Sequence, residues 1–425
     1  MKWKLTCLPI ALFLSSISFA ADINLPAPDE KSSVKNYSKV IGWPAGKMPV
    51  APQGFKVSKF ANNLQSPRWI YALPNGDVLI AEAKTEEKNP IKKVGAMVSG
   101  ASKSGNKGDA GNRITLFRDA NGDGTYELRE SFLTDLKQPF GMLLLRDSFY
   151  VANSDSLWRY PYKTGETKIT GQGEKILDLP ADGRHWTKNI IANADGSKIY
   201  VAIGSASDHA EDGIEKEKVR ARIIEINPDG SGFRVYASGL RNPVGMGWSG
   251  GKLWTAVNER DELGNDLVPD YLTEVKENGF YGWPYSYWGD HMDPRLKGAG
   301  ADQAKNAIIP NVSLGAHTAS LGLAFYDKNL FPVKYHNGAF IGQHGSWNRA
   351  VLSGYKVVFV PFKNGKPSGE PEDFLVGFVS NLKKSEVYGR PVGVTVLNDG
   401  SILVADDVSN TVWKVTHTNE KITKR

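Results

Sequence analysis

A short pattern that recurs along the chain constrains the fold more than any other feature of this sequence. Each copy begins with a turn that contains Asn, Asp or Gly and continues into a short apolar run, which is typical of a hairpin turn followed by a strand. One copy is too small to bury both faces of a sheet, so the copies must pack against one another. Six copies occur, at residues 73–82, 145–153, 193–204, 248–257, 336–342 and 397–406.

The six copies predict an all-β fold, a six-bladed β-propeller, in which radially packed sheets cover each other's faces. Helical periodicity is scarce, and a second strand often follows a copy, as at residues 156–160 and 411–415. A β-sandwich or barrel with similar turns is the alternative, but the covered length and the number of copies favour the propeller. The irregular spacing predicts long insertions at residues 84–112 and 284–310, and long loops often carry function.

The first twenty residues predict a secretory signal peptide. Two lysines precede a mostly apolar run at residues 5–14, and small residues precede Ala21, so we expect cleavage before Ala21 and export to the periplasm. The alternative, a permanent membrane anchor, is disfavoured because the apolar run is too short to span a bilayer comfortably. Cleavage removes Cys7, the one cysteine of the 425 residues, and lowers the net charge from +6 to +4. Disulfides, thiol catalysis and cysteine metal sites are therefore excluded from the mature chain.

The remaining chain divides into three predicted parts. Residues 21–52 are polar and contain five prolines, which predicts an extended arm on the surface. Residues 53–418 form the predicted propeller, the catalytic domain, and residues 419–425 form a short C-terminal tail. The net charge is mild for this length, and no long basic block with interleaved aromatic residues is present, so nucleic acid is a poor first candidate for a partner.

The stretch from Asp119 to Glu130 matches the twelve-residue spacing of a calcium-binding loop. Asp119, Asn121, Asp123, Gly124 and Glu130 fall at its ligand or turn positions. The preceding residues alternate like a strand and not like the entering helix of such a loop. We therefore favour a polar hairpin turn, with a structural calcium site as the alternative.

Two loops carry side chains suited to redox or proton chemistry. His185 lies in a glycine-containing loop directly before a predicted strand at 189–193, and therefore at one end of the propeller. Histidine is the side chain whose pKa lies nearest neutral pH, so it suits proton abstraction; a hydrogen-bonded loop histidine is the alternative. Arg241 and Asn242 lie in a tight loop between glycines, where a guanidinium suits a carboxylate or a quinone oxygen.

Other loops add charge at equivalent places. The acidic stretch 257–266 offers oxygen ligands for a hard cation such as calcium. Arg349 and Arg390 also lie in loops that border predicted strands. Each loop alone is more typical of structure than of binding, but three arginines and one histidine in equivalent loops indicate a polyanionic ligand at one mouth of the propeller.

These motifs resemble those of the glucose/sorbosone dehydrogenase family, whose soluble members carry pyrroloquinoline quinone (PQQ), and most closely the sorbosone-dehydrogenase-like branch. The matching segments are residues 184–188, 239–243, 258–263, 281–284 and 344–349. The resemblance spans most of residues 53–416 and implies a six-bladed propeller that binds PQQ and calcium. The implied activity is that of a periplasmic dehydrogenase oxidising an aldose or a sugar aldehyde, with a quinone or a cytochrome as electron acceptor.

The resemblance also implies roles for individual residues. His185 matches the general base, and Arg241 and Asn242 match the pair beside the reacting quinone carbonyl. The remaining cofactor contacts are expected at Gln138, Arg349 and Arg390. The calcium loop is expected at Glu259, Arg260 and Asp261, where backbone carbonyls serve as ligands as much as side chains do.

Departures from the family pattern concern the pocket. Arg184 precedes the histidine, where a more distant branch has an acidic residue that would orient it, and Arg349 stands where that branch has a lysine. Tyr388 or a neighbour stands where a second arginine near Arg390 is expected, and Arg68 is a further candidate for a pocket cation. Glucose is therefore not a safe guess as substrate.

Two alternative functions follow from the same fold. The first is a non-catalytic propeller that binds a carbohydrate or a partner protein, and tight PQQ binding would argue against it. The second is a calcium-dependent lactonase-type propeller, which needs a carboxylate-rich metal site on the central axis and fits the arginine-rich pattern poorly.

Overall fold

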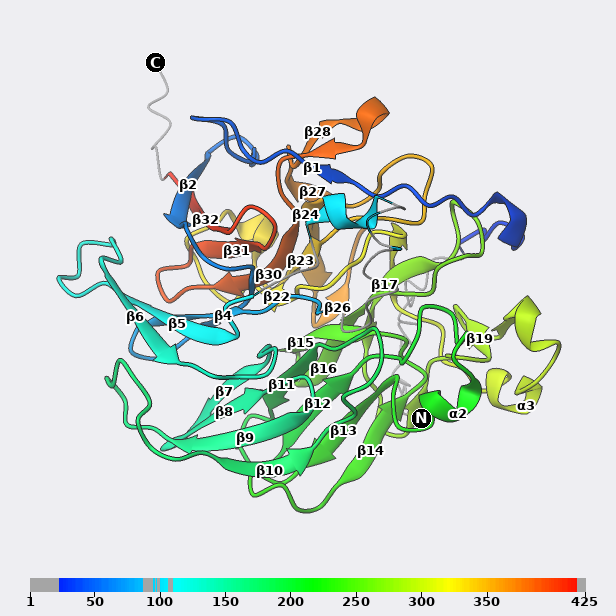
Figure 1. Ribbon diagram of the computed structural model, residues 1–425, viewed down its shortest axis with the longest axis horizontal. Helices are drawn as coiled ribbons and strands as arrows, with labels where there is room; N and C mark the ends of the chain where they lie inside the picture. Colours follow the sequence, from blue (N-terminus) through cyan, green and yellow to red (C-terminus); the bar gives the residue numbers. More distant parts are fainter. Residues whose placement is uncertain (1–22, 87–94, 96, 98–99, 106–109, 419–425) are drawn as a thin grey trace, which may run out of the picture.

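The computed structural model describes residues 23–86, 95, 97, 100–105 and 110–418. The predicted signal peptide, Cys7, the predicted tail at 419–425 and part of the insertion at 84–112 lie outside these residues. Strands dominate the described chain, and the helices whose bounds the structure describes are three or four residues long (Figure 1). The predicted all-β class is therefore confirmed.

Six sheets of four or five strands follow one another along the described chain. The first contains β3 (Pro67–Ala72), β4 (Val78–Glu82), β5 (Arg113–Arg118) and β6 (Leu128–Leu133). The second contains β7 (Met142–Leu145), β8 (Ser148–Ala152), β9 (Ser156–Pro161) and β10 (Glu174–Asp178). The third contains β11 (Lys188–Ala192), β12 (Ile199–Ile203), β13 (Arg222–Ile226), β14 (Arg234–Ser238) and the short β18 (Gly279–Phe280).

The other three sheets have the same antiparallel order. The fourth contains β15 (Pro243–Ser249), β16 (Lys252–Val257), β17 (Pro269–Glu274) and β21 (Val312–Ala316). The fifth contains β22 (Ala324–Phe325), β23 (Ala339–Gln343), β24 (Lys356–Val360) and β27 (Glu372–Leu375). The sixth contains β30 (Pro391–Val396), β31 (Ile402–Asp406), β32 (Thr411–His417) and β2 (Phe55–Ala61).

Each copy of the sequence pattern supplies the second strand of one sheet and the turn that leads into it. These second strands are β4, β8, β12, β16, β23 and β31. In β4, β12, β23 and β31 every residue is buried, because neighbouring sheets cover both faces. A strand covered on both faces reads as a continuous apolar run instead of an alternating one, which is why these six segments stand out in the sequence.

The first strands of neighbouring sheets contact one another. The contacting pairs are β3 with β30, β30 with β22 and β23, β22 with β15, β15 with β11, and β11 with β7. Between the first two sheets, the Leu144 N–H of β7 donates to the Tyr71 hydroxyl of β3 at 3.0 Å. The sheets therefore meet along their first strands, and their outer strands lie towards the rim (Figure 1).

The sixth sheet joins the two ends of the folded chain. Strand β2, near the start, pairs antiparallel with β32, near the end, and the two lie side by side in blue and red (Figure 1). Phe55 of β2 packs edge-to-face against Phe331, Tyr335 and Phe374 of the fifth sheet and its connections. This pairing brings β3, which follows β2, against β30.

Glycines allow the first strands to approach closely. A Cβ atom added to Gly342 in β23, or to Gly322 before β22, would lie 2.1 Å from the Val392 carbonyl oxygen of β30. Real Cβ atoms do not approach an oxygen so closely, so a side chain at either position forces the fifth and sixth sheets apart.

The segment before β2 lies across one end of the sheets. It contains η1 (Glu30–Ser32) and β1 (Lys39–Val40), and β1 pairs with β29 (Glu386–Val387) beside β28 (Val379–Asn381). The Tyr37 ring stacks on Trp347 at 5.7 Å. The other short elements are α2 (Ile214–Glu217), β19 (Ser286–Tyr287), β20 (His291–Met292), α3 (Ala301–Ala304), β25 (Phe362–Lys363), β26 (Lys366–Pro367), η2 (Ala101–Ser104), η3 (Pro294–Leu296), η4 (Val333–Tyr335) and η5 (Leu382–Lys384).

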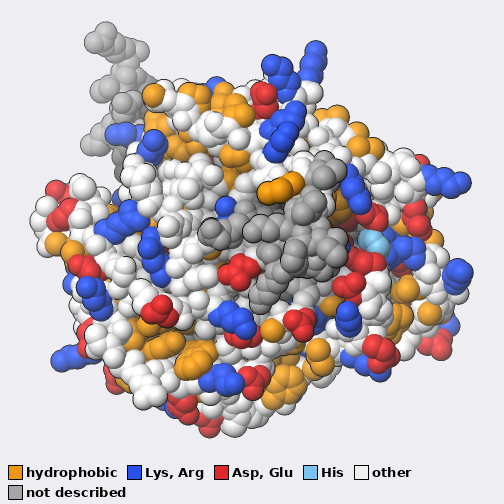
Figure 2. All heavy atoms as spheres, viewed as in Figure 1, with side chains coloured by type: hydrophobic (Ala, Val, Ile, Leu, Met, Phe, Trp, Pro, Cys, Tyr) orange, Lys and Arg blue, Asp and Glu red, His pale blue; other side chains and the backbone are white. Residues whose placement is uncertain are grey.

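Charge is mixed over the surface. Figure 2 shows Lys and Arg side chains interspersed with Asp and Glu over the described part of one face. In the ranges that the structure describes, none of the helices combines the length and the apolar character needed to cross a membrane.

Replacing Gly342 tests the close approach of the fifth and sixth sheets. We expect Gly342→Ala to lower the free energy of unfolding by about 1–3 kcal/mol, the usual range for overpacking, measured by urea denaturation. Gly171→Ala is the matched control, because its added Cβ would meet only Pro161 at 3.6 Å, an ordinary contact. Equal stability of the two variants would contradict the packing described here.

Candidate functional site

The loops at one edge of the sheets carry the candidate site. In an antiparallel pair the start of the first strand and the end of the second lie at the same edge, as Lys188 pairs with Ile203 and Pro243 with Val257. Residues just before a first strand and just after a second strand are therefore brought together. Most of the predicted site residues occupy one of these two positions.

His185 precedes β11 and is oriented by Ser205, which follows β12. Its Nδ1 lies 3.1 Å from the Ser205 carbonyl oxygen and 2.9 Å from Ser205 Oγ. A carbonyl only accepts, so Nδ1 carries the hydrogen, and Ser205 Oγ is free to accept because it donates to the Ser207 carbonyl at 2.7 Å. The Nε2 lone pair is left without a hydrogen-bond partner among the described residues.

The surroundings of His185 favour the neutral ring. Burial, together with the nearby Arg241 guanidinium, lowers the pKa of His185 well below its ordinary value of 6.5. A neutral imidazole with hydrogen on Nδ1 and a free lone pair on Nε2 is the form that accepts a proton. The geometry of His185 is therefore that of a base.

Arg241 precedes β15 and lies beside His185. It is almost fully buried, and its Nη2 lies 2.9 Å from the Asp261 carboxylate. Its Nε donates to the Asp208 carbonyl at 2.9 Å and its Nη1 to the Asn258 carbonyl at 3.1 Å. The Ser205 N–H donates to the Arg241 carbonyl at 2.7 Å, which links the arginine to the loop that holds the histidine.

The Asn242 side chain lies next to His185, across Gly204. A Cβ added to Gly204 would lie 2.2 Å from Asn242 Oδ1 and 2.6 Å from His185 Cβ, so glycine is required between these two side chains. Asn242 Oδ1 is buried and has no hydrogen-bond partner within the described residues. An unpaired buried oxygen is costly, which is typical of a site that holds a ligand.

A second cluster combines two guanidinium groups with one carboxylate. Asp407 follows β31 and accepts from Arg68 Nη1 at 2.7 Å and from His344 Nε2 at 2.9 Å. Within the described residues the guanidinium of Arg390, which precedes β30, donates to the carbonyls of His344, Gly345 and Ser104. Arg68 Nε is buried without a hydrogen-bond partner in the described part of the chain. Asp407 is thus the carboxylate that pairs with a guanidinium here, while Asp406 accepts from the Arg390 backbone N–H at 2.8 Å.

The two clusters meet at Trp186. Trp186 directly follows His185 in the chain, and the Arg68 guanidinium lies 5.6 Å from the centre of the Trp186 ring. The Lys188 Nζ donates to the Trp186 carbonyl at 2.9 Å, and Lys188 is fully buried. Burial, reinforced by the charge of Arg220, lowers the pKa of Lys188 well below its ordinary value, so this amine is a poor cation.

The remaining predicted cofactor contacts lie further out. Gln138 is buried, and its Nε2 donates to the Lys84 carbonyl at 2.8 Å, next to Thr85, which accepts from the Trp186 indole. Arg349 lies at the rim, where its Nε donates to the Asn265 carbonyl at 3.0 Å. The structure thus gathers His185, Arg241 and Asn242, links Gln138 to Trp186 through residues 84–85, places Arg390 beside His344, and engages Arg349 with the 265–266 loop.

The charged side chains of the predicted calcium loop are engaged mostly by residues outside the loop. Arg260 Nη1 lies 3.0 Å from Asp293, and Asp261 is engaged by Arg241 and by His317 Nδ1 at 3.2 Å. Glu259 accepts from the Arg260 N–H at 2.9 Å, and burial raises its pKa to about 7. The calcium site at these residues stays a prediction.

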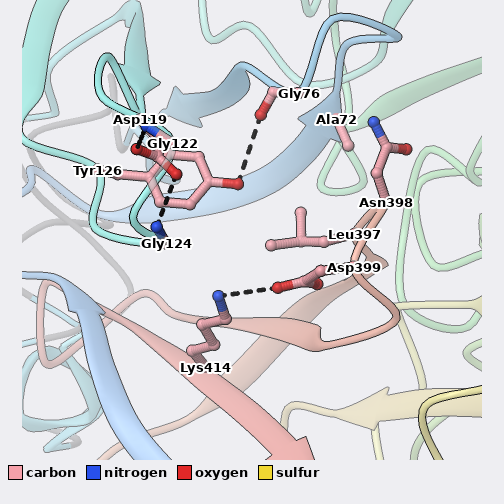
Figure 3. Close-up of a pocket in the computed structure, with 10 residues that line it drawn as sticks. All are labelled: Ala72, Gly76, Asp119, Gly122, Gly124, Tyr126, Leu397, Asn398, Asp399 and Lys414. Carbon is pink, nitrogen blue, oxygen red and sulfur yellow. Dashed lines mark hydrogen bonds and ion pairs between the residues drawn. The ribbon is translucent and has the colours of Figure 1, made fainter.

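The Asp119 loop lies away from this edge. Asp119 accepts from the Gly122 N–H at 2.7 Å and the Gly124 N–H at 2.8 Å, so its carboxylate is satisfied by the turn itself. It borders a pocket in which Lys414 pairs with Asp399 at 3.1 Å (Figure 3). Across the described residues, no group of three or more His, Cys, Asp and Glu side chains is placed to hold a metal ion. Calcium binding at this loop stays the alternative to the polar turn that we favour.

One sequence motif is explained by the fold. Residues 247–251 have the spacing Gly-x-Ser-x-Gly, which in hydrolases marks a strand-to-helix turn with a serine nucleophile. Here the motif spans the end of β15 and the turn into β16, at the opposite edge of the fourth sheet from His185. The strand-to-helix context of that nucleophile is absent there.

Arg184, the residue before His185, does not orient the histidine; it pairs with Asp208 and, at 3.3 Å, with Glu211. Several residues that support the site were not identified from the sequence alone. Ser205, Asp208 and Asp407 all follow the second strand of a sheet, so the six repeats together with the edge rule were a signal that pointed to them. Burial and the Asp261 charge raise the pKa of Asp208 to about 6.

Comparisons with known proteins agree with the family resemblance. A family model described as Glucose / Sorbosone dehydrogenase matches residues 152–352, and one described as TrAA12-like matches residues 289–418. An uncharacterized protein of Borreliella burgdorferi is 28% identical over 384 residues, covering 86% of this chain and 89% of that protein. Aldose sugar dehydrogenase YliI of Escherichia coli is 26% identical over 201 residues, covering 41% of this chain and 50% of that protein. The match at 152–352 confirms the resemblance to the family.

Solved structures resemble the fold. The holo form of the pyranose dehydrogenase PQQ domain from Coprinopsis cinerea has a TM-score of 0.69 at 19% identity, covering 90% of this chain and 100% of that chain. The PQQ-bound form of aldose sugar dehydrogenase from Streptomyces coelicolor has a TM-score of 0.56 at 15% identity, covering 86% and 99%. At these identities the likeness shows a shared fold.

Replacing Asp407 tests the electrostatics of the second cluster. Burial alone would raise the pKa of Asp407, but His344 and Arg68 lower it below its ordinary value. We expect Asp407→Asn to cost about 3–5 kcal/mol in the free energy of unfolding, because it leaves the Arg68 charge buried without a counter-ion. Asp373→Asn is the control, since the exposed Asp373–Lys356 pair is worth about 0–1 kcal/mol. Urea denaturation that gave equal losses would refute this account.

Proposed function

We propose that this chain, whose residues 152–352 match the glucose/sorbosone dehydrogenase family, is a PQQ-dependent dehydrogenase that oxidises an aldose or a related sugar aldehyde. The observation that carries the proposal is the neutral His185 with a free Nε2 beside Arg241 and Asn242. We further propose that the six sheets are the blades of a six-bladed β-propeller and that this edge is its mouth.

The residues present fit a polyanionic quinone. PQQ carries several carboxylates, and Arg68 and Arg390 are two buried guanidinium groups, of which Arg68 pairs with Asp407 and Arg390 donates to backbone carbonyls. Arg68 Nε and Asn242 Oδ1 are buried polar atoms with no partner among the described residues. Arginine suits carboxylates because its planar fork donates two parallel hydrogen bonds. Arg68, Arg390, Asn242 and Arg241 would therefore hold the cofactor, with Gln138 at its edge.

The chain's own residues supply binding and proton transfer. His185 Nε2 takes the proton of the sugar hydroxyl, while the hydrogen bond from Nδ1 to Ser205 keeps the ring in the tautomer that does so. Arg241 keeps His185 unprotonated before the reaction and places a positive charge where negative charge develops. When bound, PQQ supplies the acceptor for the hydride that leaves the sugar carbon.

Calcium is part of the proposal. Glu259 and Asp270 are buried carboxylates whose pKa values burial raises to about 7 and about 6. A bound cation would relieve this cost. With two carboxylates available, backbone carbonyls of the 258–261 loop would complete the set of ligands, as the resemblance implies.

We also propose export to the periplasm, on the strength of the predicted signal peptide at residues 1–20. Electrons would leave the reduced enzyme to a quinone or to a cytochrome.

Reconstitution tests the proposed activity. The purified protein, incubated with PQQ with and without calcium, should gain the absorbance of bound PQQ and reduce an artificial acceptor with at least one sugar of an aldose panel. His185→Ala should keep bound PQQ but lose about 10²–10⁴-fold in turnover. His336→Ala, at the opposite edge of the fifth sheet, is the control and should keep turnover. A protein that binds no PQQ and oxidises no sugar would rule the proposal out.

The pH profile tests the state of the base. Because burial and Arg241 disfavour the imidazolium, His185 stays unprotonated to lower pH than an ordinary histidine, so the acid limb of kcat/KM should lie below pH 6.5. Asp208, with a pKa of about 6, titrates in the same range, so Asp208→Asn serves as the control and should retain the limb. A limb centred at or above pH 6.5 in both proteins would contradict the assignment.

A further inference from the structure

One buried carboxylate, that of Glu217, is linked to both His185 and Arg241 through other residues and contacts neither of them directly. Glu217 ends α2 and is 5% exposed. Its carboxylate accepts from the Ala206 N–H at 3.1 and 3.0 Å, from Ser207 Oγ at 3.0 Å and from the Trp283 indole N–H at 3.3 Å. All four hydrogen bonds come from neutral donors, and the Arg220 guanidinium acts on Glu217 from beyond ion-pair distance. A buried carboxylate satisfied only by neutral donors is tightly defined in position.

The hydrogen bonds from Ala206 and Ser207 link Glu217 to the proposed base, His185. Ala206 and Ser207 directly follow Ser205, whose carbonyl and hydroxyl face His185 Nδ1. The Ser205 hydroxyl donates to the Ser207 carbonyl, so the 205–207 segment is held at both ends. Glu217 thereby fixes the acceptor that keeps the hydrogen on Nδ1 and the lone pair on Nε2.

The hydrogen bond from the Trp283 indole links Glu217 to the Arg241 guanidinium. The Trp283 ring lies under the Arg241 guanidinium, with 5.8 Å between Cζ and the ring centre. The backbone N–H of Trp283 donates to the carbonyl of Gly239, two residues before Arg241, at 3.0 Å. The indole bond to Glu217 fixes the ring in its plane, and the ring supports the guanidinium from below.

We propose that Glu217 is a positioning residue that sets the relative placement of the His185 base and the Arg241 cation. The proposal rests on the dehydrogenase function proposed above, but the hydrogen bonds that carry it belong to the protein without cofactor. Two loops far apart in the sequence, 205–207 and 281–284, converge on this one carboxylate. Removing the acceptor oxygens of Glu217 releases the Ser205 segment and the Trp283 ring together, so His185 and Arg241 lose their relative placement at the same time.

Substitution at Glu217 weakens these bonds in steps. Glutamine keeps one acceptor oxygen but turns an amide donor towards either Ser207 or the Trp283 N–H, whereas alanine removes every acceptor. Glu215→Gln is the matched control, because Glu215 lies on the same helix, carries the same charge, is 80% exposed in its side chain and pairs only with Lys218 at 2.6 Å.

The test reads the tautomer of His185 in the protein without cofactor. In the ¹⁵N-histidine NMR spectrum at pH 7.5, assigned with His185→Ala, the wild type and Glu215→Gln should show His185 with hydrogen on Nδ1. Glu217→Gln should shift the His185 ring nitrogens towards a mixture of tautomers, and Glu217→Ala should shift them further. A folded Glu217→Gln with unchanged His185 signals overturns the proposal, and this variant decides the question if Glu217→Ala does not fold.

Kinetics of the reconstituted protein give a second readout. With PQQ and a sugar substrate, Glu217→Gln should lower kcat by about tenfold or more with KM within about twofold, since the defect lies in the base and not in sugar binding. Equal kcat values for Glu217→Gln and Glu215→Gln would also overturn the proposal. If no sugar is oxidised by the wild type, the proposed function fails, while the NMR result still decides the role of Glu217 in orienting His185.

Discussion

Antiparallel pairing of the first two strands in each sheet is the constraint on which the site depends. It fixes the start of one strand and the end of the next at a common edge. His185 and Ser205 meet in this way across β11 and β12, and Arg390 and Asp407 across β30 and β31. Because the convergence is a property of the backbone, side chains at these positions can differ between related proteins without moving the site.

Burial divides the charged groups of the site into two kinds. His185 and Lys188 are both driven towards their neutral forms by burial and by nearby arginines. Arginine keeps its proton under all physiological conditions. The positive charge of the site therefore rests on Arg68, Arg241 and Arg390. Backbone carbonyls largely fix the guanidinium groups of Arg241 and Arg390, whereas Asp407 holds that of Arg68. A base that stays neutral can thus lie beside cations that stay charged.

Much of the fold could be predicted from the sequence because burial on both faces leaves continuous apolar runs. The six repeats located the second strand of every sheet, and the loops next to them contained His185, Arg241 and Arg390. The residues that support the site could not be predicted from the sequence, for a physical reason. Glu217 acts through hydrogen bonds to residues 206, 207 and 283, and neither its type nor its spacing marks a site. The engagement of Asp261 by Arg241 and His317 likewise depends on loops from different parts of the chain.

The pairing of β2 with β32 has a consequence for how the molecule is made. Phe55 aligns with His417, so the sixth sheet joins segments at opposite ends of the described chain. Contacts between residues so far apart in sequence form late, since a long loop must close first. Until residue 417 has been synthesised, β2 has no partner strand and Arg68 has no Asp407. The chain therefore has to be kept from aggregating until its last strand is available, and the completed sheet marks the end of folding.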